Sequence, residues 1–351
     1  MSPQKAFKHS RRGTTDGYAT RSSANPRLSP DTPGLIGVEK IYPHSDETEA
    51  CFGILQDMFS AFLIFCTLAA DTPSPLSGQI CLDKDGFSCN AIDGIWGAKS
   101  ERARELRQST RQSFGPYGNL FRIEAVTQAD LDALVAIPKE PADKAKLPHM
   151  GYESIKEMFA ERGHLSPRGL ERLNPGIDWS HVAVGTKLVI PDFPSIEENL
   201  AAGDPLKQKK SKRPLAEVVK VSLSKFEITV WGTNGTCLAL FPCSIAKDKA
   251  KRPQAGELRV VTKIPHPNYT YTPDFVPKGQ KASKHILMDG PNNPVGVAWI
   301  GLSLPTYGIH GTPKPETIGS AESHGCFRLS NWNVARLYAL VKIGTKVVIE
   351  P

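Results

Sequence analysis

Several common functional signals are missing from this 351-residue sequence. It has no CxxC or HExxH spacing, so nothing in its cysteine and histidine pattern supports a zinc site, and we expect neither a metal nor a cofactor. The first fifty residues have almost no apolar periodicity. A segment that buries so little apolar surface cannot offset its ordering entropy, so we expect it to be disordered.

The composition excludes a helical bundle. Twenty-nine proline and 29 glycine residues predict many turns and linkers, while the length and 40% hydrophobic residues predict two or three modules with real cores. A net charge of +7 suits an acidic partner. The densest basic run, residues 207–213, lies in a segment rich in proline and charge, so we interpret it as a solvated linker and expect no nucleic-acid partner.

An apolar run over residues 59–70 is too short to span a bilayer comfortably, but it suits the core of an export signal with a cleavage site after Ala70. Translation would then begin at Met58, with residues 58–70 as the signal and residues 1–57 as a disordered or over-extended N-terminus. No Lys or Arg would precede the apolar run in that case. Export predicts a periplasmic or envelope location and no stable membrane span after cleavage. The alternative is a buried helix in a cytoplasmic thiol enzyme.

The seven cysteines leave at least one thiol free, because their number is odd. Cys81 and Cys89 flank a turn and could pair in an oxidising compartment. Cys237 and Cys243 are not expected to pair. If one strand holds both, they lie roughly 20 Å apart at about 3.3 Å per residue, and a disulfide needs Cα atoms within about 7 Å.

The candidate site is a glycine-rich stretch, residues 307–329, which sets His310 and His324 near Cys326. A nucleophilic thiol needs a base and nearby backbone amides, here around Gly325, to hold the oxyanion formed on attack at a carbonyl. A neighbouring imidazole can hold the pair as thiolate and imidazolium near neutral pH. Metal ligation by these three side chains is the alternative, and no ligand spacing supports it.

The C-terminal region, residues 216–351, predicts a mostly β domain. Apolar residues alternate over residues 219–230, residues 232–235 supply a hairpin turn, and further short strands follow. One helix is expected to open at Asn331 and to stop at Gly344.

Two short modules are expected before this domain. Residues 71–115 place an IDGIWG turn between two helices and resemble a peptidoglycan-binding domain, which is a small α-helical fold. Residues 151–194 run helix, helix, LNP and then GTKLVIP, and resemble a LysM module, which is a small α+β glycan-binding fold. Each module could bind the wall or serve only as a spacer. We interpret residues 116–150 as a connector and residues 195–215 as a linker.

The C-terminal domain resembles an L,D-transpeptidase catalytic domain of the YkuD type, which implies a β-sandwich. The resemblance is carried by the segments YGIHGT and SHGCFRL, by Asn331 and by a final GTKVVI strand. It implies Cys326 as nucleophile and His310 as base, assisted by His324, with backbone groups at Gly325 and Gly311. The implied substrate contacts are Arg328, Tyr307 and Ser323.

Peptidoglycan stem peptides and glycan are the partners that this resemblance implies. The implied reaction cleaves the bond between a diamino acid and D-Ala in a tetrapeptide stem and transfers the acyl group to an amine of another stem, giving a 3→3 cross-link in cell-wall remodelling. Water as acceptor would make the enzyme an L,D-carboxypeptidase. A wall-binding protein that has lost activity is a further alternative. We expect residues 265–290 to set substrate selectivity.

Overall fold

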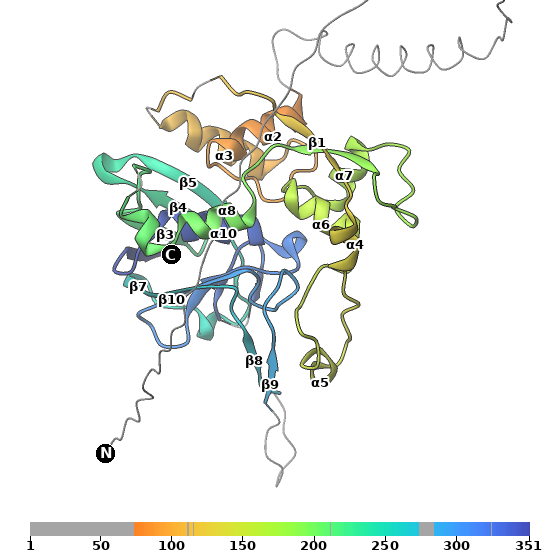
Figure 1. The fold of residues 1–351 in the computed structure, drawn as a ribbon. Helices are drawn as coiled ribbons and strands as arrows, with labels where there is room; N and C mark the ends of the chain where they lie inside the picture. The colour runs from red at the N-terminus through yellow and green to blue at the C-terminus, as the bar shows by residue number, and fades with distance from the viewer. Residues whose placement is uncertain (1–73, 111, 115, 211, 274–283, 324) are drawn as a thin grey trace, which may run out of the picture. The chain divides into compact units, whose positions relative to one another are not determined.

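The computed structural model describes residues 74–110, 112–114, 116–210, 212–273, 284–323 and 325–351, all of which belong to one unit, Leu68–Pro351 (Figure 1). The expectations for residues 1–57 and 58–70 fall outside these ranges. In the described ranges no helix is long and apolar enough to cross a membrane.

The first two helices enclose the IDGIWG loop. The Ser74 hydroxyl caps α2 (Pro75–Lys84), and α3 (Ala98–Ser109) begins directly after the loop. Gln79 holds the loop from inside: its amide oxygen accepts from the Gly94 amide at 2.8 Å and its amide nitrogen donates to the Ile95 carbonyl at 2.9 Å. Gly94 has φ +73°, a left-handed value that favours glycine. The two helices expected around this loop are therefore present.

The disulfide considered for Cys81 and Cys89 is absent, because both are free thiols in the structure. Cys237 and Cys243 are also free, and both are buried around strand β5 (Cys237–Pro242). Burial raises the pKa of the Cys89 thiol to about 12 and that of Cys237 to about 11.

The connector predicted for residues 116–150 is wrong, because it contains a strand. β1 (Phe121–Ala125) pairs antiparallel with β2 (Lys187–Pro191), the strand expected near residue 190. Between them lie the two expected helices, α6 (Ile155–Arg162) and α7 (Pro167–Leu173), and two short ones, α4 (Gln128–Asp132) and α5 (Pro141–Lys144). The unit over residues 121–191 is therefore a two-stranded sheet with helices inserted between its strands.

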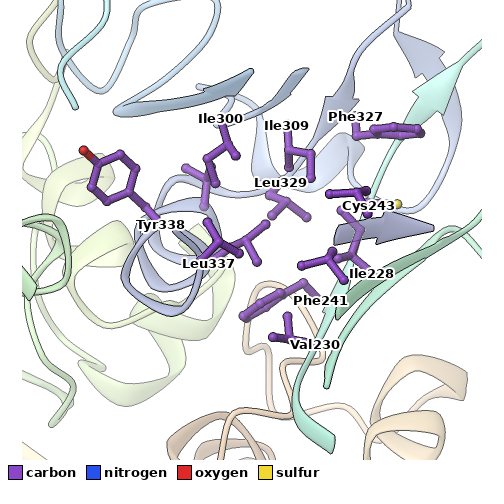
Figure 2. Close-up of a cluster of buried hydrophobic side chains, with 14 of the residues drawn as sticks. Ile228, Val230, Phe241, Cys243, Ile300, Ile309, Phe327, Leu329, Leu337 and Tyr338 are labelled. Atoms are coloured by element: carbon purple, nitrogen blue, oxygen red, sulfur yellow. The ribbon is translucent and has the colours of Figure 1, made fainter. Parts of the chain in front are cut away.

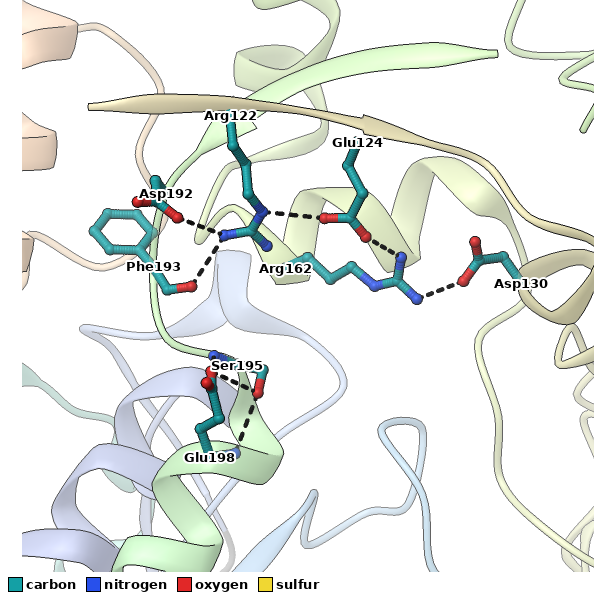
Figure 3. Close-up of polar contacts among 8 residues, drawn as sticks. All are labelled: Arg122, Glu124, Asp130, Arg162, Asp192, Phe193, Ser195 and Glu198. Atoms are coloured by element: carbon teal, nitrogen blue, oxygen red, sulfur yellow. Dashed lines mark hydrogen bonds and ion pairs between the residues drawn. The ribbon is translucent and has the colours of Figure 1, made fainter. Parts of the chain in front are cut away.

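A chain of ion pairs between arginine and carboxylate side chains connects the elements of this two-stranded unit (Figure 3). Arg122 and Arg162 share Glu124, with N–O distances of 3.1 and 2.6 Å, and Arg162 also contacts Asp130 at 2.5 Å. Arg122 further donates to Asp192 just after β2, at 3.3 Å. These side chains are partly solvated, so we expect each pair to add at most about 1 kcal/mol of stability.

The linker predicted for residues 195–215 is also wrong in part, because it is helical and packed. A capping box of Ser195 and Glu198 starts α8 (Ile196–Ala202), and α9 (Pro205–Gln208) follows (Figure 3). Leu200 is 5% exposed and lies in the core of the C-terminal domain. Gln208 donates to the carbonyls of Ala339 and Val341 at 2.9 and 3.0 Å. This segment is therefore part of the C-terminal domain.

The C-terminal domain is built on one eight-stranded sheet, where the sequence predicted a β-sandwich. The long strand β7 (Gly256–Pro265) joins two halves: its first residues pair with β14 (Lys346–Glu350) and its last with β10 (Ala298–Leu302). The strand order is β13-β11-β10-β7-β14-β3-β4-β5. The remaining bounds are β3 Val218–Ser222, β4 Glu227–Trp231, β11 Gly308–His310 and β13 Phe327–Arg328.

Short elements lie around this sheet. β6 (Ile245–Ala246) pairs with β12 (Ala321–Ser323), and β8 (Tyr269–Tyr271) forms a hairpin with β9 (His285–Leu287). That hairpin occupies the segment expected to set selectivity, of which residues 274–283 lie outside the described ranges. The single-turn helices are η1 Thr233–Gly235, η2 Lys249–Lys251 and η3 Pro315–Thr317.

Both halves of the sheet contribute to one apolar core (Figure 2). Ile228, Val230 and Phe241 come from one half, Ile300 and Ile309 from the other, and all five are fully or almost fully buried. Burying each such side chain stabilises the fold by about 1.5–3 kcal/mol relative to leaving it exposed. The sheet therefore curls around a core that its two halves share.

Helix α10 (Asn331–Leu340) packs into this core and lies beside α8 (Figure 1). It begins at Asn331, as predicted, with Val334, Leu337 and Tyr338 buried. It ends at Leu340, so the predicted stop at Gly344 is wrong. Gly344 has φ +90° and serves the turn into β14.

The two N-terminal units dock on the C-terminal domain through buried polar contacts. Asp83 at the end of α2 contacts His164 at 3.0 Å and Arg336 of α10 at 3.3 Å. The His164 ring stacks between Phe193 and Trp332, with centroids 4.1 and 5.4 Å away. One buried cluster thus joins three segments that the sequence placed in three modules.

Candidate active site

The candidate nucleophile and base lie on neighbouring strands at one edge of the sheet. β11 and β13 run parallel, with Ile309 opposite Phe327 and His310 opposite Arg328. Ile309 and Phe327 both point into the core. Because side chains alternate along a strand, His310 and Arg328 face away from the core, on the side reached by Cys326, which immediately precedes β13. The structure thus brings Cys326, His310 and Arg328 together, and His324 lies outside the described residues.

His310 is held in one orientation and one tautomer. Its ring is 7% exposed and stacks on Trp299 of β10, with centroids 5.6 Å apart. Nδ1 lies 2.7 Å from the Gly311 carbonyl oxygen, which can only accept a hydrogen bond, so Nδ1 carries the proton. Nε2 of the neutral ring is then free to take a proton. This is the form that a general base requires.

Burial lowers the pKa of His310 to about 4, even though the Gly311 carbonyl favours the protonated ring; nearby Arg328 lowers it further. Burial also raises the pKa of the Cys326 thiol, and a hydrogen bond from the Gly308 backbone opposes this only in part. Both shifts favour the neutral forms. The thiolate–imidazolium pair expected from the sequence is therefore not the resting state that the described residues support.

The Cys326 thiol donates to the carbonyl of Thr306, with an Sγ–O distance of 3.4 Å. Thr306 has φ +67°, a strained value for a β-branched residue. This contact orients the proton of the thiol toward Thr306, and no motif in the sequence indicates it. Thr306 and Trp299 are the two site residues that the sequence reasoning missed.

Ser323 shapes the turn that carries the nucleophile. Its hydroxyl is buried, donates to the Cys326 carbonyl at 2.6 Å and accepts from the Gly325 amide at 3.3 Å. A Cβ added at Gly325 would meet nothing within 4 Å, so there is space beside this backbone for a substrate. The predicted role of Ser323 in binding substrate becomes, in our interpretation, one of holding the turn.

Gly311 is required by close packing. A Cβ there would lie 2.3 Å from Oδ1 of Asn331 and 3.1 Å from Cα of Gly296. The other two predicted substrate contacts are held by hydrogen bonds to distant segments of the chain. Arg328 exchanges backbone hydrogen bonds with Ser244, and the Tyr307 hydroxyl donates to the Lys251 carbonyl. Among the residues that the structure describes, no group of three or more His, Cys, Asp or Glu side chains could hold a metal ion.

Comparison with known proteins bears on the C-terminal region of the chain. The family model of the L,D-transpeptidase catalytic domain, YkuD, matches residues 216–349. This part of the chain is therefore a YkuD-type L,D-transpeptidase catalytic domain. The match begins at Ala216 and includes neither α8 nor the two N-terminal units.

Curated relatives carry the same name. The chain is 26% identical over 195 residues to "Putative L,D-transpeptidase YkuD" of Bacillus licheniformis, covering 56% of this chain and 93% of the relative. It is 34% identical over 99 residues to "Putative L,D-transpeptidase YqjB" of Bacillus subtilis, covering 27% of this chain and 49% of the relative. It is 25% identical over 197 residues to "Probable L,D-transpeptidase ErfK/SrfK" of Escherichia coli, covering 55% of this chain and 58% of the relative.

Among solved structures, L,D-transpeptidase 3 from Mycobacterium tuberculosis is similar at 19% identity and a TM-score of 0.32. The similarity covers 39% of this chain and 61% of that chain.

Proposed function

We propose that this protein is an L,D-transpeptidase that uses Cys326 as its nucleophile on peptidoglycan tetrapeptide stems. One observation carries the proposal: Cys326 directly precedes the strand that pairs with the strand of His310, and Nδ1 of His310 is held by the Gly311 carbonyl, which leaves Nε2 free as a base. The domain match and the intact cysteine and histidine supply the reaction class. Because the proposed substrate is peptidoglycan, we expect this protein to work in the envelope or periplasm.

The proposed reaction has two halves. Cys326 Sγ attacks the carbonyl between the diamino acid and the terminal D-Ala, and its proton passes to His310 Nε2. Backbone amides at the turn, of which that of Cys326 is the leading candidate, meet the oxyanion. The C–N bond then breaks, His310 protonates the leaving D-Ala amine, and a thioester remains on Cys326.

An amine of a second stem attacks the thioester in the second half. It gives a proton to His310, an amide forms, and the thiolate leaves and regains its proton. This gives a 3→3 cross-link, whereas attack by water would give a carboxypeptidase. The fixed guanidinium fork of Arg328 suits a stem-peptide carboxylate, so we propose it as a substrate contact.

Intact-mass analysis of enzyme and products tests the proposal. The full chain is incubated with a disaccharide-tetrapeptide donor, with and without a diamino-acid acceptor. We expect release of D-Ala and an acyl adduct on Cys326 with the donor alone. A new amide product should form only when the acceptor is present. Product at the wild-type rate from Cys326→Ala, or an adduct on another residue, would overturn the mechanism.

Wall binding by the N-terminal units is a second proposed function. The observation that favours it is an exposed apolar pair on the loop between α2 and α3, where Ile95 is 56% and Trp96 is 37% exposed. We expect the full chain to sediment with purified sacculi and Trp96→Ala to weaken this binding. Equal sedimentation of both would leave these units as structural supports.

A further inference from the structure

A buried carboxylate outside the catalytic domain reaches the candidate active site. Glu161, on α6, is 8% exposed and makes two hydrogen bonds. Its Oε1 accepts from the Tyr152 hydroxyl at 2.8 Å, and its Oε2 accepts from Nδ2 of Asn331 at 2.9 Å. Glu161 and Asn331 are 170 residues apart in the sequence. The contact therefore links the two-stranded N-terminal unit to the first turn of α10.

Glu161 fixes the orientation of the Asn331 carboxamide. Nδ2 of Asn331 also donates to the Pro291 carbonyl at 3.0 Å, while its Oδ1 accepts from the Val297 amide at 3.3 Å. Turning the amide over would set Oδ1 against the Pro291 carbonyl, which cannot donate, and Nδ2 against the Val297 amide, which cannot accept. Asn331 itself is fully buried, so an unmade hydrogen bond here would be costly.

Asn331 in turn fixes the backbone that holds the base. Its Oδ1 packs against Gly311 and Gly296 so closely that a Cβ at either glycine would lie within 2.3 Å of it. The carbonyl of Gly311 is the acceptor for His310 Nδ1 at 2.7 Å. A shift of Asn331 therefore moves the group that sets the tautomer and tilt of His310.

We propose that Glu161 is a positioning residue for His310, acting through Asn331 and Gly311. This inference rests on the proposed function of His310 as the base. The N-terminal unit that contains Glu161 would then support the reaction. It would hold the Gly311 carbonyl in the position that keeps the proton of His310 on Nδ1 and leaves the lone pair on Nε2.

A neighbouring contact supplies a matched control. Glu157, one turn earlier on α6, accepts from the Asn292 side chain at 2.7 Å across the same interface. That contact does not involve Asn331 or Gly311. Variants at Glu157 therefore weaken docking of the same helix without removing a hydrogen bond of Asn331 or of Gly311.

The experiment compares the full chain with Glu161→Met, Glu161→Gln, Glu157→Met and Glu157→Gln. Methionine fills similar space but accepts no comparable hydrogen bond, whereas glutamine still presents an amide oxygen to Asn331. The rate constant for acylation of Cys326 by a carbapenem is measured at saturation, together with the half-saturating concentration. The imidazole ¹H–¹⁵N spectrum reports the His310 tautomer and is assigned with His310→Gln. Thermal unfolding is recorded for every variant.

We expect Glu161→Met to lower the saturated rate constant about 10- to 100-fold, because misplacing a reacting group by about 1 Å costs about this much. Its half-saturating concentration should stay the same, and its His310 signal should show a mixture of tautomers. Glu161→Gln should retain most of the rate and the Nδ1–H tautomer, and both Glu157 variants should match the wild type in rate and tautomer.

Equal losses from Glu161→Met and Glu157→Met, or an unchanged tautomer in Glu161→Met, would overturn the inference. If Glu161→Met fails to fold, Glu161→Ala, which leaves room for water, gives the same comparison. If the wild type forms no adduct on Cys326, the proposed function fails, and the tautomer spectra still decide whether Glu161 positions His310.

Discussion

The protonation state of the Cys326–His310 pair gives the sharpest prediction. Burial lowers the pKa of His310 from 6.5 to about 4. At about 1.36 kcal/mol per pKa unit, this shift alone disfavours the imidazolium by about 3 kcal/mol. Burial also raises the pKa of the Cys326 thiol, which disfavours the thiolate. Both shifts oppose transfer of the proton from sulfur to imidazole, so we expect the neutral pair to predominate at pH 7.

Ultraviolet absorbance of the thiolate measures this directly. Subtracting the spectrum of Cys326→Ser from that of the wild type cancels the absorbance of the other six cysteines. The difference is recorded from pH 4 to pH 10. We expect no difference below about pH 8 and a rise above the ordinary thiol range, unchanged by His310→Gln. Alkylation of Cys326 by iodoacetamide, followed at the peptide level, should rise about tenfold per pH unit between pH 6 and pH 8.

The shape of the alkylation profile matters more than its size. A thiolate of low pKa is intrinsically less nucleophilic, so an ion pair and a neutral pair could react at similar rates at pH 7. An ion pair would instead give a flat profile from about pH 5. Thiolate absorbance already present at pH 6, and abolished by His310→Gln, would refute the neutral pair.

Three further predictions follow from buried contacts. Burial raises the pKa of Glu161 from 4.5 to about 7, so the folded state binds this proton more tightly than the unfolded state. The free energy of unfolding should therefore fall by up to about 3 kcal/mol as the pH rises from 4.5 past 7. Urea unfolding should show this loss in the wild type but not in Glu161→Gln. Gly311→Ala should lose about 1–3 kcal/mol in urea unfolding and at least tenfold in acylation rate, because its Cβ would overlap Asn331; a full rate would contradict this. A fragment of residues 216–351 lacks Leu200 of the core and Glu161, one of the hydrogen-bond partners of Asn331, so we expect no cooperative thermal transition by circular dichroism, whereas residues 74–351 should give one.

Local patterns in the sequence predicted the strands of the catalytic domain well. Val219 and Val221 alternate with polar residues, and both are fully buried on β3. β1 escaped notice because none of its residues is fully buried and its partner lies more than sixty residues away. α8 escaped notice because a helix of seven residues has room for few apolar contacts, here chiefly Ile196 and Leu200.

Some features of the candidate site could likewise be predicted from the sequence, and others could not. Cys326 and His310 stand out by residue type, and the pairing of β11 with β13 brings their segments together. Their charge state could not be predicted, because it depends on desolvation by residues brought together only in the fold. The contact of Glu161 with Asn331 has no local signature either, since the two residues come from different units of the chain.

The catalytic domain defined by the family match is therefore shorter than the domain that folds around the shared core. The family match begins at residue 216, yet the core of that domain includes Leu200, and its helix α10 is held at its start and near its middle by residues further upstream. Asn331 at its start is bound by Glu161, and Arg336 near its middle is bound by Asp83. Since the first of these contacts also reaches the backbone that holds His310, the N-terminal units support the candidate active site as well as any wall binding they perform. A tethered-module arrangement would let those units be exchanged freely; buried polar contacts of this kind make the exchange costly, because each separated partner would be left unpaired.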